Sequence, residues 1–225
     1  MTPDRHHPFR NRREAGRRLA QAVLHLKDTN PVVLALPRGG VPVGFEVARL
    51  LGTDLDILLV RKIGAPGHEE LGLGAIVDGA NPQIVLNDEI VRTTGATPAY
   101  IETEVARQLA ELERRRTAYR GGAKHVSLKG RAVIVVDDGI ATGGTVKAAV
   151  QGLRLTSPAR LILAIPVAPV ESLAALRPLC DEVICLMRPS PFYAVGAHYL
   201  DFSQTTDDEV CQLLKSASHT PTMQS

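Results

Sequence analysis

The chain has 225 residues, of which 44% are hydrophobic and 22% are charged, and its formal net charge is +2. This composition excludes collagen-like, low-complexity and wholly disordered proteins, and the length is sufficient for one domain with a large buried core. No apolar run approaches the ~20 residues that span a bilayer, and the charged N-terminal segment lacks the apolar core of a signal peptide. We therefore expect a cytoplasmic protein without a membrane partner.

Positive charge is concentrated at the start of the chain. Such a segment is more often the solvated face of a first helix than a surface that binds nucleic acid. We therefore do not expect a nucleic-acid partner, although the basic segment keeps an RNA-binding alternative open. The arginines in question are Arg5, Arg10, Arg12, Arg13, Arg17 and Arg18.

Short, β-branched apolar segments alternate with helical patterns, which is typical of a parallel sheet buried on both faces. The pattern predicts a three-layer α/β domain over residues 1–225, with right-handed crossovers and a frayed tail at 216–225. In chain order we expect a strand at 32–36, a helix at 41–51, strands at 55–60, 72–78 and 83–86, a helix at 98–119, a strand at 132–136, a helix at 144–155, a strand at 160–165, a helix at 169–178 and a strand at 182–186.

The strongest functional signal is an apolar strand that runs into Asp137 and Asp138 and then into a turn rich in glycine and threonine. In an open α/β sheet, ligands bind at the carboxyl ends of strands, where these acids fall. Small residues let backbone N–H groups surround a phosphate at the positive end of the following helix. The two carboxylates can accept hydrogen bonds from sugar hydroxyls, so the pattern suits a ribose 5-phosphate. The expected phosphate-binding residues are Gly139, Ala141, Thr142, Gly143, Gly144 and Thr145.

The segment Val133–Thr145 resembles the phosphoribosyl pyrophosphate motif of type I phosphoribosyltransferases. Pro37–Gly40 follows the first strand, as the family's pyrophosphate loop does, and residues 61–67 resemble its mobile loop. Residues 189–203 resemble the small C-terminal hood that covers the acceptor site. The resemblance covers residues 8 to 216 and is strongest to a bacterial branch known only as predicted phosphoribosyltransferases. It implies the type I phosphoribosyltransferase fold, a homodimer and a cis peptide bond after Pro37.

The resemblance also implies roles for individual residues in a transfer that releases pyrophosphate. Asp137 and Asp138 would hold the sugar hydroxyls or the waters of a Mg²⁺ ion that is bound through the substrate. Lys62 would close over the pyrophosphate, and it is the third candidate catalytic residue. The residues expected to bind pyrophosphate beside it are Arg38, Gly39, Gly40 and Arg61.

The acceptor site is the least defined part of this prediction. The hood carries Phe192, Tyr193 and Tyr199, which could stack on a planar acceptor or simply pack a hydrophobic core. Family members that act on hypoxanthine and guanine carry an aspartate where this chain has Ala141. We therefore expect a planar nitrogenous acceptor, with an adenine-like compound ahead of a 6-oxopurine.

Three functions compete on these residues. The leading one is transfer of a phosphoribosyl group to a base or amine, or the reverse reaction. The second is a regulatory protein that senses phosphoribosyl pyrophosphate and binds RNA or another partner. The third is salvage or hydrolysis of a different sugar phosphate, although no Gly-x-Ser-x-Gly nucleophile motif supports hydrolysis.

Overall fold

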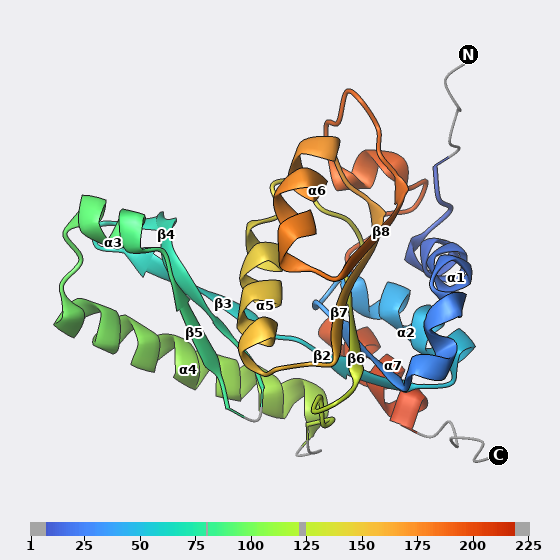
Figure 1. Cartoon of the computed structure of the whole chain (residues 1–225), viewed down its shortest axis with the longest axis horizontal. Coiled ribbons are helices and arrows are strands. Elements are labelled where there is room, and N and C mark those ends of the chain that lie inside the picture. Colours follow the sequence, from blue (N-terminus) through green and yellow to red (C-terminus); the bar gives the residue numbers. More distant parts are fainter. Residues whose placement is uncertain (1–7, 80, 122–124, 219–225) are drawn as a thin grey trace.

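Five short strands form a parallel sheet at the centre of the molecule (Figure 1), in the order β2-β1-β6-β7-β8. The structure, a computed structural model, describes residues 8–79, 81–121 and 125–218. Both β1 and β6 are buried along their whole length, which explains their continuous apolar sequences. The predicted parallel α/β core is therefore confirmed. Its strands are β1 (Pro31–Ala35), β2 (Asp54–Ile57), β6 (Ala132–Val136), β7 (Arg160–Val167) and β8 (Glu182–Met187).

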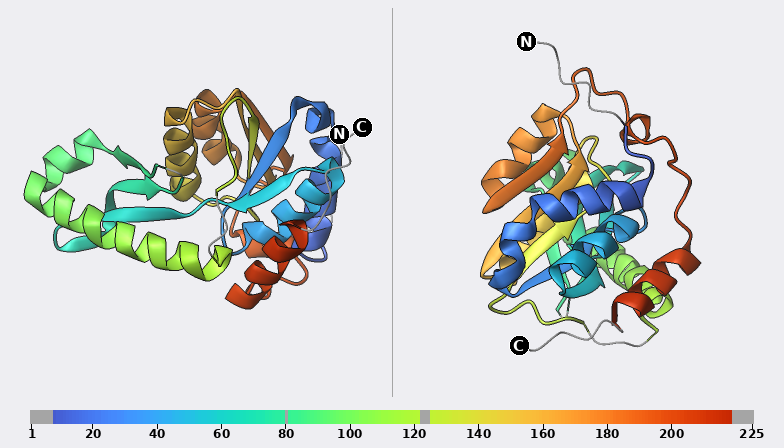
Figure 2. Two further views of the ribbon diagram at one scale, coloured as in Figure 1. Left: turned by 90° about the horizontal axis from the view of Figure 1, so that it is seen from below. Right: turned by 90° about the vertical axis from the view of Figure 1, so that its right-hand side faces the viewer.

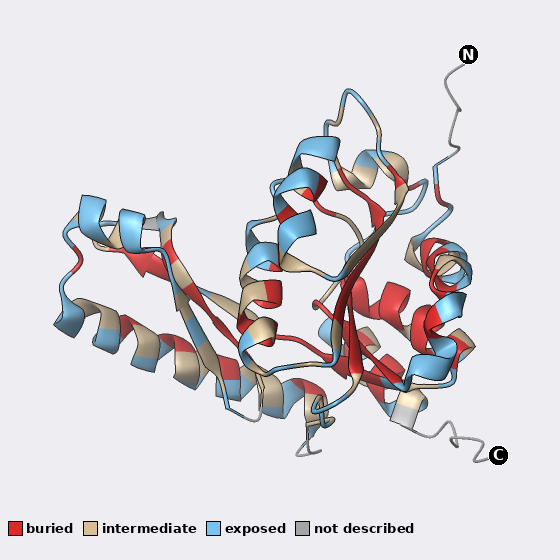
Figure 3. Ribbon diagram, viewed as in Figure 1, coloured by how far each residue is buried: buried red, intermediate tan, exposed pale blue. Residues whose placement is uncertain are grey.

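Helices cover both faces of this sheet (Figure 2). Side chains alternate along β6, so that Ile134 packs in the core under α1, α2 and α7, whereas Val133 and Val135 pack under α5 and α6. The buried residues accordingly concentrate along the central strands and on the inner faces of the helices (Figure 3). The first face carries α1 (Arg12–Ala22), α2 (Gly40–Leu51) and α7 (Asp207–Ser218), and the second carries α5 (Gly144–Leu155) and α6 (Val170–Leu176).

A second, antiparallel sheet and one long helix project from this body as an arm (Figure 1). The helix α4 begins after Thr97, whose side chain accepts the Tyr100 N–H, and ends at Gly121, which has a left-handed backbone. It packs along β3, while α5 of the body contacts all three strands of the arm. The arm consists of β3 (Val60–Ala65), β4 (His68–Val77), β5 (Gln83–Leu86), α3 (Asp88–Thr94) and α4 (Pro98–Arg120).

The expected strand over 55–60 is divided between the two sheets. β2 leaves the central sheet at Ile57, and β3 begins at Val60, which pairs with Val77 of β4. Leu58 and Leu59 between them are each 3% exposed, so the apolar run continues through the crossing and conceals it in the sequence. Residues 61–65, expected in a mobile loop, are therefore part of a strand.

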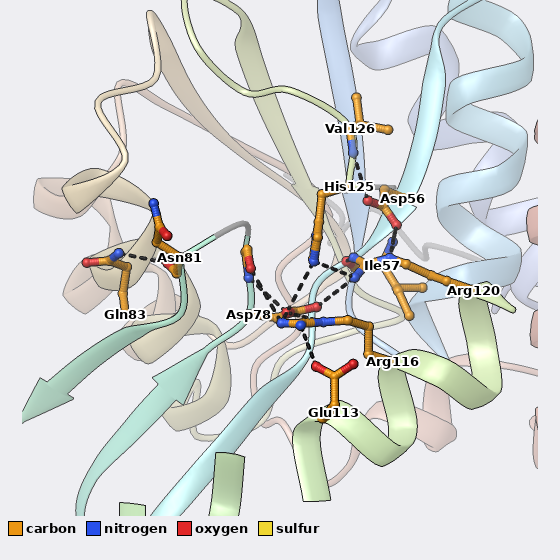
Figure 4. A network of polar contacts seen from close by, with 11 residues as sticks. Asp56, Ile57, Asp78, Asn81, Gln83, Glu113, Arg116, Arg120, His125 and Val126 are labelled. Atoms are coloured by element: carbon orange, nitrogen blue, oxygen red, sulfur yellow. Dashed lines mark hydrogen bonds and ion pairs between the residues drawn. The ribbon is translucent and has the colours of Figure 1, made fainter. Parts of the chain in front are cut away.

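A buried ionic network joins the arm to the body (Figure 4). Arg120, at the end of α4, donates to Asp56 of β2 at 2.8 Å and to Asp78 after β4 at 3.1 Å. Arg116 donates to Asp78 at 2.5 Å, and the His125 ring lies 3.1 Å from Arg120. Burial and the charge of Arg120 lower the pKa of His125, which indicates a neutral ring that accepts from the guanidinium. Charges on both sides of the joint are thus satisfied by one another.

The C-terminal part returns across the carboxyl edge of the sheet and then forms α7. The helix α7 extends to Ser218, and the rest of the expected tail at 216–225 lies outside the described part. Between β8 and α7, the segment corresponding to the expected hood contains one short helix. The short 3₁₀ helices are η1 (Leu24–Thr29), η2 (Arg177–Leu179) and η3 (Val195–His198). Within the described ranges, no helix is both long and apolar enough to cross a membrane.

Candidate functional site

Two loops meet at the carboxyl edge of the sheet because β1 and β6 are neighbouring parallel strands. The turn Pro37–Gly40 lies directly on the acids that follow β6. A Cβ atom on Gly39 would overlap the Asp138 carboxylate, and one on Gly40 would lie 2.8 Å from the Val136 carbonyl oxygen. Glycine is therefore needed at both positions. The peptide bond between Pro37 and Arg38 is cis, which confirms the prediction.

The two acids are half-buried and held in different ways. Asp137 Oδ1 accepts the backbone N–H of Asp138 at 2.8 Å. Asp138 Oδ2 accepts from Arg12 Nε at 2.7 Å, and the Asp138 carbonyl oxygen accepts the Tyr199 hydroxyl at 2.5 Å. Burial raises the pKa of Asp137 well above its usual range, and the neighbouring charge of Asp138 raises it further. Burial also raises the pKa of Asp138, against the opposing effect of Arg12.

The loop after the acids is anchored at its base and exposed at its tip. Ile140 is buried, and its N–H donates to the Val167 carbonyl, while the Ala141 carbonyl accepts from Ser172 Oγ at 2.6 Å. Gly143 has a φ of 79° and caps the start of α5, so the unpaired N–H groups of the first helical turn lie at the tip. This is the arrangement that the sequence predicts for a phosphate site. The exposed residues at the tip are Ala141, Thr142, Gly144 and Thr145.

A cavity of about 1070 Å³ separates this loop from the arm. Lys62 lines it from β3, and a Cβ atom at Gly72 of β4 would touch the Lys62 stem at 3.5 Å. The N-terminal end of α3 forms the far wall. The cavity thus brings Lys62 and the predicted phosphate loop to one space, even though Lys62 lies in a strand. The loop residues that line it are Asp137, Gly139, Ile140, Ala141, Thr142, Gly143, Gly144 and Thr145.

The two arginines expected at the pyrophosphate have other partners. Arg38 Nη1 lies 3.6 Å from Asp207 at the start of α7, and Arg38 does not line the cavity. Gly39 and Gly40 lie against the two acids and do not line the cavity either, while the Arg38 side chain points to α7, a helix that was not expected from the sequence. Arg61 does line the cavity, and its Nε donates to Gln108 of α4 at 2.9 Å. Burial, followed by the charge of Arg115, lowers the pKa of Arg61.

The hood aromatics divide between packing and exposure, and none lines the cavity. Tyr199 is 6% exposed, with its ring centroid 5.3 Å from Phe9 and 5.1 Å from Phe202. The Tyr199 ring therefore packs in the core and is not available to stack on an acceptor. This contact could not be predicted, because Phe9 is distant from Tyr199 in sequence. Phe192 is half-buried and stacks on His198 at 5.6 Å. Tyr193 is 83% exposed and keeps an accessible ring.

Arg12 is a site residue that the sequence analysis missed. We expected the N-terminal arginines to form a solvated face, but the Arg12 side chain is 12% exposed and bonds to Asp138. Arg13 and Arg17 of the same helix face Glu46 of α2 instead. No local pattern distinguishes Arg12 from its neighbours. Only its position at the first turn of α1, beside the carboxyl edge of the sheet, does so.

A parallel sheet that carries a tight glycine turn, two acids and a loop rich in glycine and threonine at its carboxyl edge defines the type I phosphoribosyltransferase fold. The family model described as the phosphoribosyl transferase domain matches residues 9–201. The chain therefore belongs to the phosphoribosyl transferase family, as the motif in the sequence indicated.

Relatives support the same assignment. The chain is 46% identical over 209 residues to the Mycobacterium tuberculosis proteins named "Putative phosphoribosyl transferase Rv0571c" and "Putative phosphoribosyl transferase MT0597". The match covers 93% of this chain and 47% of each relative, so the chain spans about half the length of these curated relatives.

Two solved structures share the fold. The crystal structure of TT1426 from Thermus thermophilus is 45% identical, with a TM-score of 0.83, and the match covers 93% of this chain and 98% of that chain. The AQ2163 protein from Aquifex aeolicus is 14% identical, with a TM-score of 0.50, covering 95% of this chain and 87% of that chain. The second similarity concerns the fold alone.

Proposed function

We propose that the chain binds phosphoribosyl pyrophosphate and transfers its 5-phosphoribosyl group to a nitrogenous acceptor. The observation that carries this proposal is the common cavity lined by Asp137, the 139–145 loop and Lys62. The bond between C1 of the sugar and the pyrophosphate oxygen breaks, and the pyrophosphate keeps the electron pair. A new bond forms between C1 and the acceptor nitrogen, which then loses its proton.

The 5-phosphate binds at the tip of the loop. Backbone N–H groups of the first turn of α5 donate to it, and the positive end of this helix favours its negative charge. The hydroxyl groups of Thr142 and Thr145 add two donors. The carboxylates of Asp137 and Asp138 accept hydrogen bonds from the sugar hydroxyls, which fixes the ring relative to the leaving group.

Pyrophosphate leaves between the Pro37–Gly40 turn and the arm. The ammonium of Lys62 stabilises the negative charge that develops on it, with Arg61 behind it on the same strand. The reaction is thus assisted mainly by orientation and charge. The sugar hydroxyls are held on one side, and the departing charge is stabilised on the other.

Mg²⁺ is the metal expected with this substrate, and the residues of the site fit an ion that is held partly by the substrate. Among residues 8–79, 81–121 and 125–218, no group of three His, Cys, Asp or Glu side chains could enclose an ion. Mg²⁺ commonly binds through one or two carboxylates, phosphate oxygens and water. Asp137, with Asp138 beside it, would hold such an ion together with substrate oxygens. The ion would supply neutralisation of the pyrophosphate charge.

The acceptor that the residues favour is planar and nitrogenous, with an adenine-like compound ahead of guanine or hypoxanthine. Ala141 carries no acid that could assist at a 6-oxopurine. Tyr193 offers an exposed ring, and Phe192 offers a partly exposed one. Stacking on such rings contributes roughly 1–3 kcal/mol per base and accepts many ring systems. By likeness to the family, we also propose a single phosphoribosyltransferase-like domain, a cytoplasmic location and a homodimer. Analytical sedimentation tests the homodimer.

No contact among the described residues favours the RNA-binding alternative. Arg12 pairs with Asp138, Arg13 pairs with Glu46, and the Arg18 guanidinium lies 4.9 Å from the Phe9 ring centroid. These three arginines thus have contacts within the chain itself, and Arg5 lies outside the described residues.

The test is calorimetric binding of phosphoribosyl pyrophosphate with Mg²⁺ to the double variant Asp137→Asn and Asp138→Asn. Each charge-assisted hydrogen bond is worth roughly 1.5–3 kcal/mol, so the double variant should bind on the order of 100-fold more weakly. The control replaces two adjacent acids of α7, Asp208→Asn with Glu209→Gln, and should bind as the unaltered protein does. Unchanged affinity in the first variant would reject the sugar-hydroxyl role of these acids.

Catalysis is tested by pyrophosphate release with a panel of purine bases, pyrimidine bases and amines. Release that requires one acceptor identifies both the reaction and its substrate. Tight binding of phosphoribosyl pyrophosphate with no release for any acceptor would contradict the transferase and favour a sensor of this ligand.

A further inference from the structure

Arg12 joins three parts of the chain that are distant in sequence. Its Nε donates to Asp138 Oδ2 at 2.7 Å, across a sequence separation of 126 residues. Its Nη1 donates to the Ser203 carbonyl oxygen at 2.6 Å, and its guanidinium carbon lies 3.8 Å from the centroid of the Phe202 ring. The side chain is 12% exposed, so these contacts form in a largely dry environment. One guanidinium thus connects α1, the acids after β6 and the C-terminal segment.

The charge of Arg12 acts on an acid pair that burial destabilises. Burial raises the pKa of both carboxylates, and at Asp137 the neighbouring charge of Asp138 raises it further. Arg12 opposes this effect at Asp138 by a hydrogen bond and by its charge. The ionised carboxylate is the form that accepts hydrogen bonds from sugar hydroxyls. Arg12 therefore favours the form that the proposed function requires.

The contact also distinguishes the two carboxylate oxygens of Asp138. Asp138 Oδ2 lies between Arg12 and the backbone of Gly39, where a Cβ atom would have no space. The carbonyl oxygen of the same residue is held by the Tyr199 hydroxyl. With Oδ2 and the backbone fixed, rotation of the carboxylate would break the bond to Arg12. Oδ1 is the oxygen that Arg12 does not hold.

We propose that Arg12 is a positioning residue for the sugar site, which fixes Oδ2 of Asp138 so that Oδ1 accepts from a hydroxyl of the bound sugar. Through Ser203 and Phe202 it also ties this carboxylate to the C-terminal segment at the end of the hood. The inference rests on the proposed function, since it assumes that a sugar phosphate binds here. It assigns no proton transfer to Arg12.

The test compares two ligands that share the phosphate and differ in the sugar. Calorimetry measures the affinities of ribose 5-phosphate and inorganic phosphate for the unaltered protein and for Arg12→Gln, Arg12→Lys and Arg13→Gln. Arg12→Gln should weaken ribose 5-phosphate binding about tenfold, as expected for one charge-assisted hydrogen bond, and change inorganic phosphate binding less than about twofold. Arg12→Lys should restore part of the loss, because it retains the charge. Arg13→Gln is the matched control on the same helix, since Arg13 faces Glu46 at 3.4 Å.

A general structural role for Arg12 would weaken both ligands equally, and this outcome would overturn the proposal. Unchanged ribose 5-phosphate binding in Arg12→Gln would overturn it as well. If the unaltered protein binds neither ribose 5-phosphate nor phosphoribosyl pyrophosphate, the proposed function fails. Positioning by Arg12 is then decided in the ligand-free protein by a carbon NMR titration of the Asp138 carboxyl. Arg12→Gln should raise its pKa and Arg13→Gln should leave it unchanged; an equal pKa in both variants would overturn the positioning.

Discussion

Replacement of Arg120 by methionine tests the joint between the arm and the body. The Arg120 side chain is 5% exposed and pairs with Asp56, which is 10% exposed, and with Asp78, which is 1% exposed. Removal of one partner from a buried ion pair costs about 3–5 kcal/mol, because a charge stays buried without its counter-charge. Arg116 still neutralises Asp78 at 2.5 Å, so we expect the lower end, a decrease of about 3 kcal/mol in the free energy of unfolding.

Urea denaturation followed by circular dichroism measures this decrease, with the slope of the transition as a check on the unfolding mechanism. Arg114→Met is the matched control in the same helix, because Arg114 is 68% exposed and should leave the transition midpoint unchanged. Adding Asp56→Asn to Arg120→Met should recover part of the loss, because Arg120 is the cation that pairs with the Asp56 carboxylate. A decrease below about 1 kcal/mol, or no recovery in the double variant, would refute the view that this network fixes the arm.

Three further outcomes concern the site, pH and the acceptor. Lys62→Ala should weaken pyrophosphate binding about tenfold in calorimetry, since it removes one charge-assisted contact, and this loss should exceed the decrease in the free energy of unfolding; the opposite order would assign Lys62 to the arm's structure. Stability should fall as pH drops through 6.5, the ordinary pKa of histidine, because the lowered pKa of His125 lets the unfolded chain take up the proton first. His125→Gln should reduce this fall in denaturation curves, and an unaltered profile would exclude His125 as its source. Tyr193→Ala should raise the acceptor KM about tenfold in steady-state assays, and an unchanged KM would show that this exposed ring does not contact the acceptor.

Features that depend on residues adjacent in the sequence could be predicted from the sequence. The strands β1 and β6 are continuous apolar segments because both of their faces are covered, and such segments need no knowledge of the rest of the chain. The loop around Gly143 is also local, since its shape comes from small residues between one strand and the next helix. The parallel order of the strands then brings the Pro37–Gly40 turn to the acids by the general rule for open sheets.

The boundary between the two sheets could not be predicted in this way. Leu58 and Leu59 are buried at the crossing from one sheet to the other, so the hydrophobic pattern shows no interruption there. The pairing of Val60 with Val77 decides where β3 begins, and this pairing is a property of the folded arm. Lys62, expected in a mobile loop, therefore lies in a strand and lines the cavity from there.

The partners of the charged and aromatic side chains were decided only by the tertiary structure. The sequence by itself determined the loop rich in glycine and threonine and its two acids, because these residues follow one another along the chain. It did not determine that Arg12 holds Asp138, that Arg38 faces Asp207, or that Tyr199 packs against Phe9. Each of these contacts joins residues far apart in sequence, and the packing of α1 and α7 against the sheet selects one partner from many of similar chemistry.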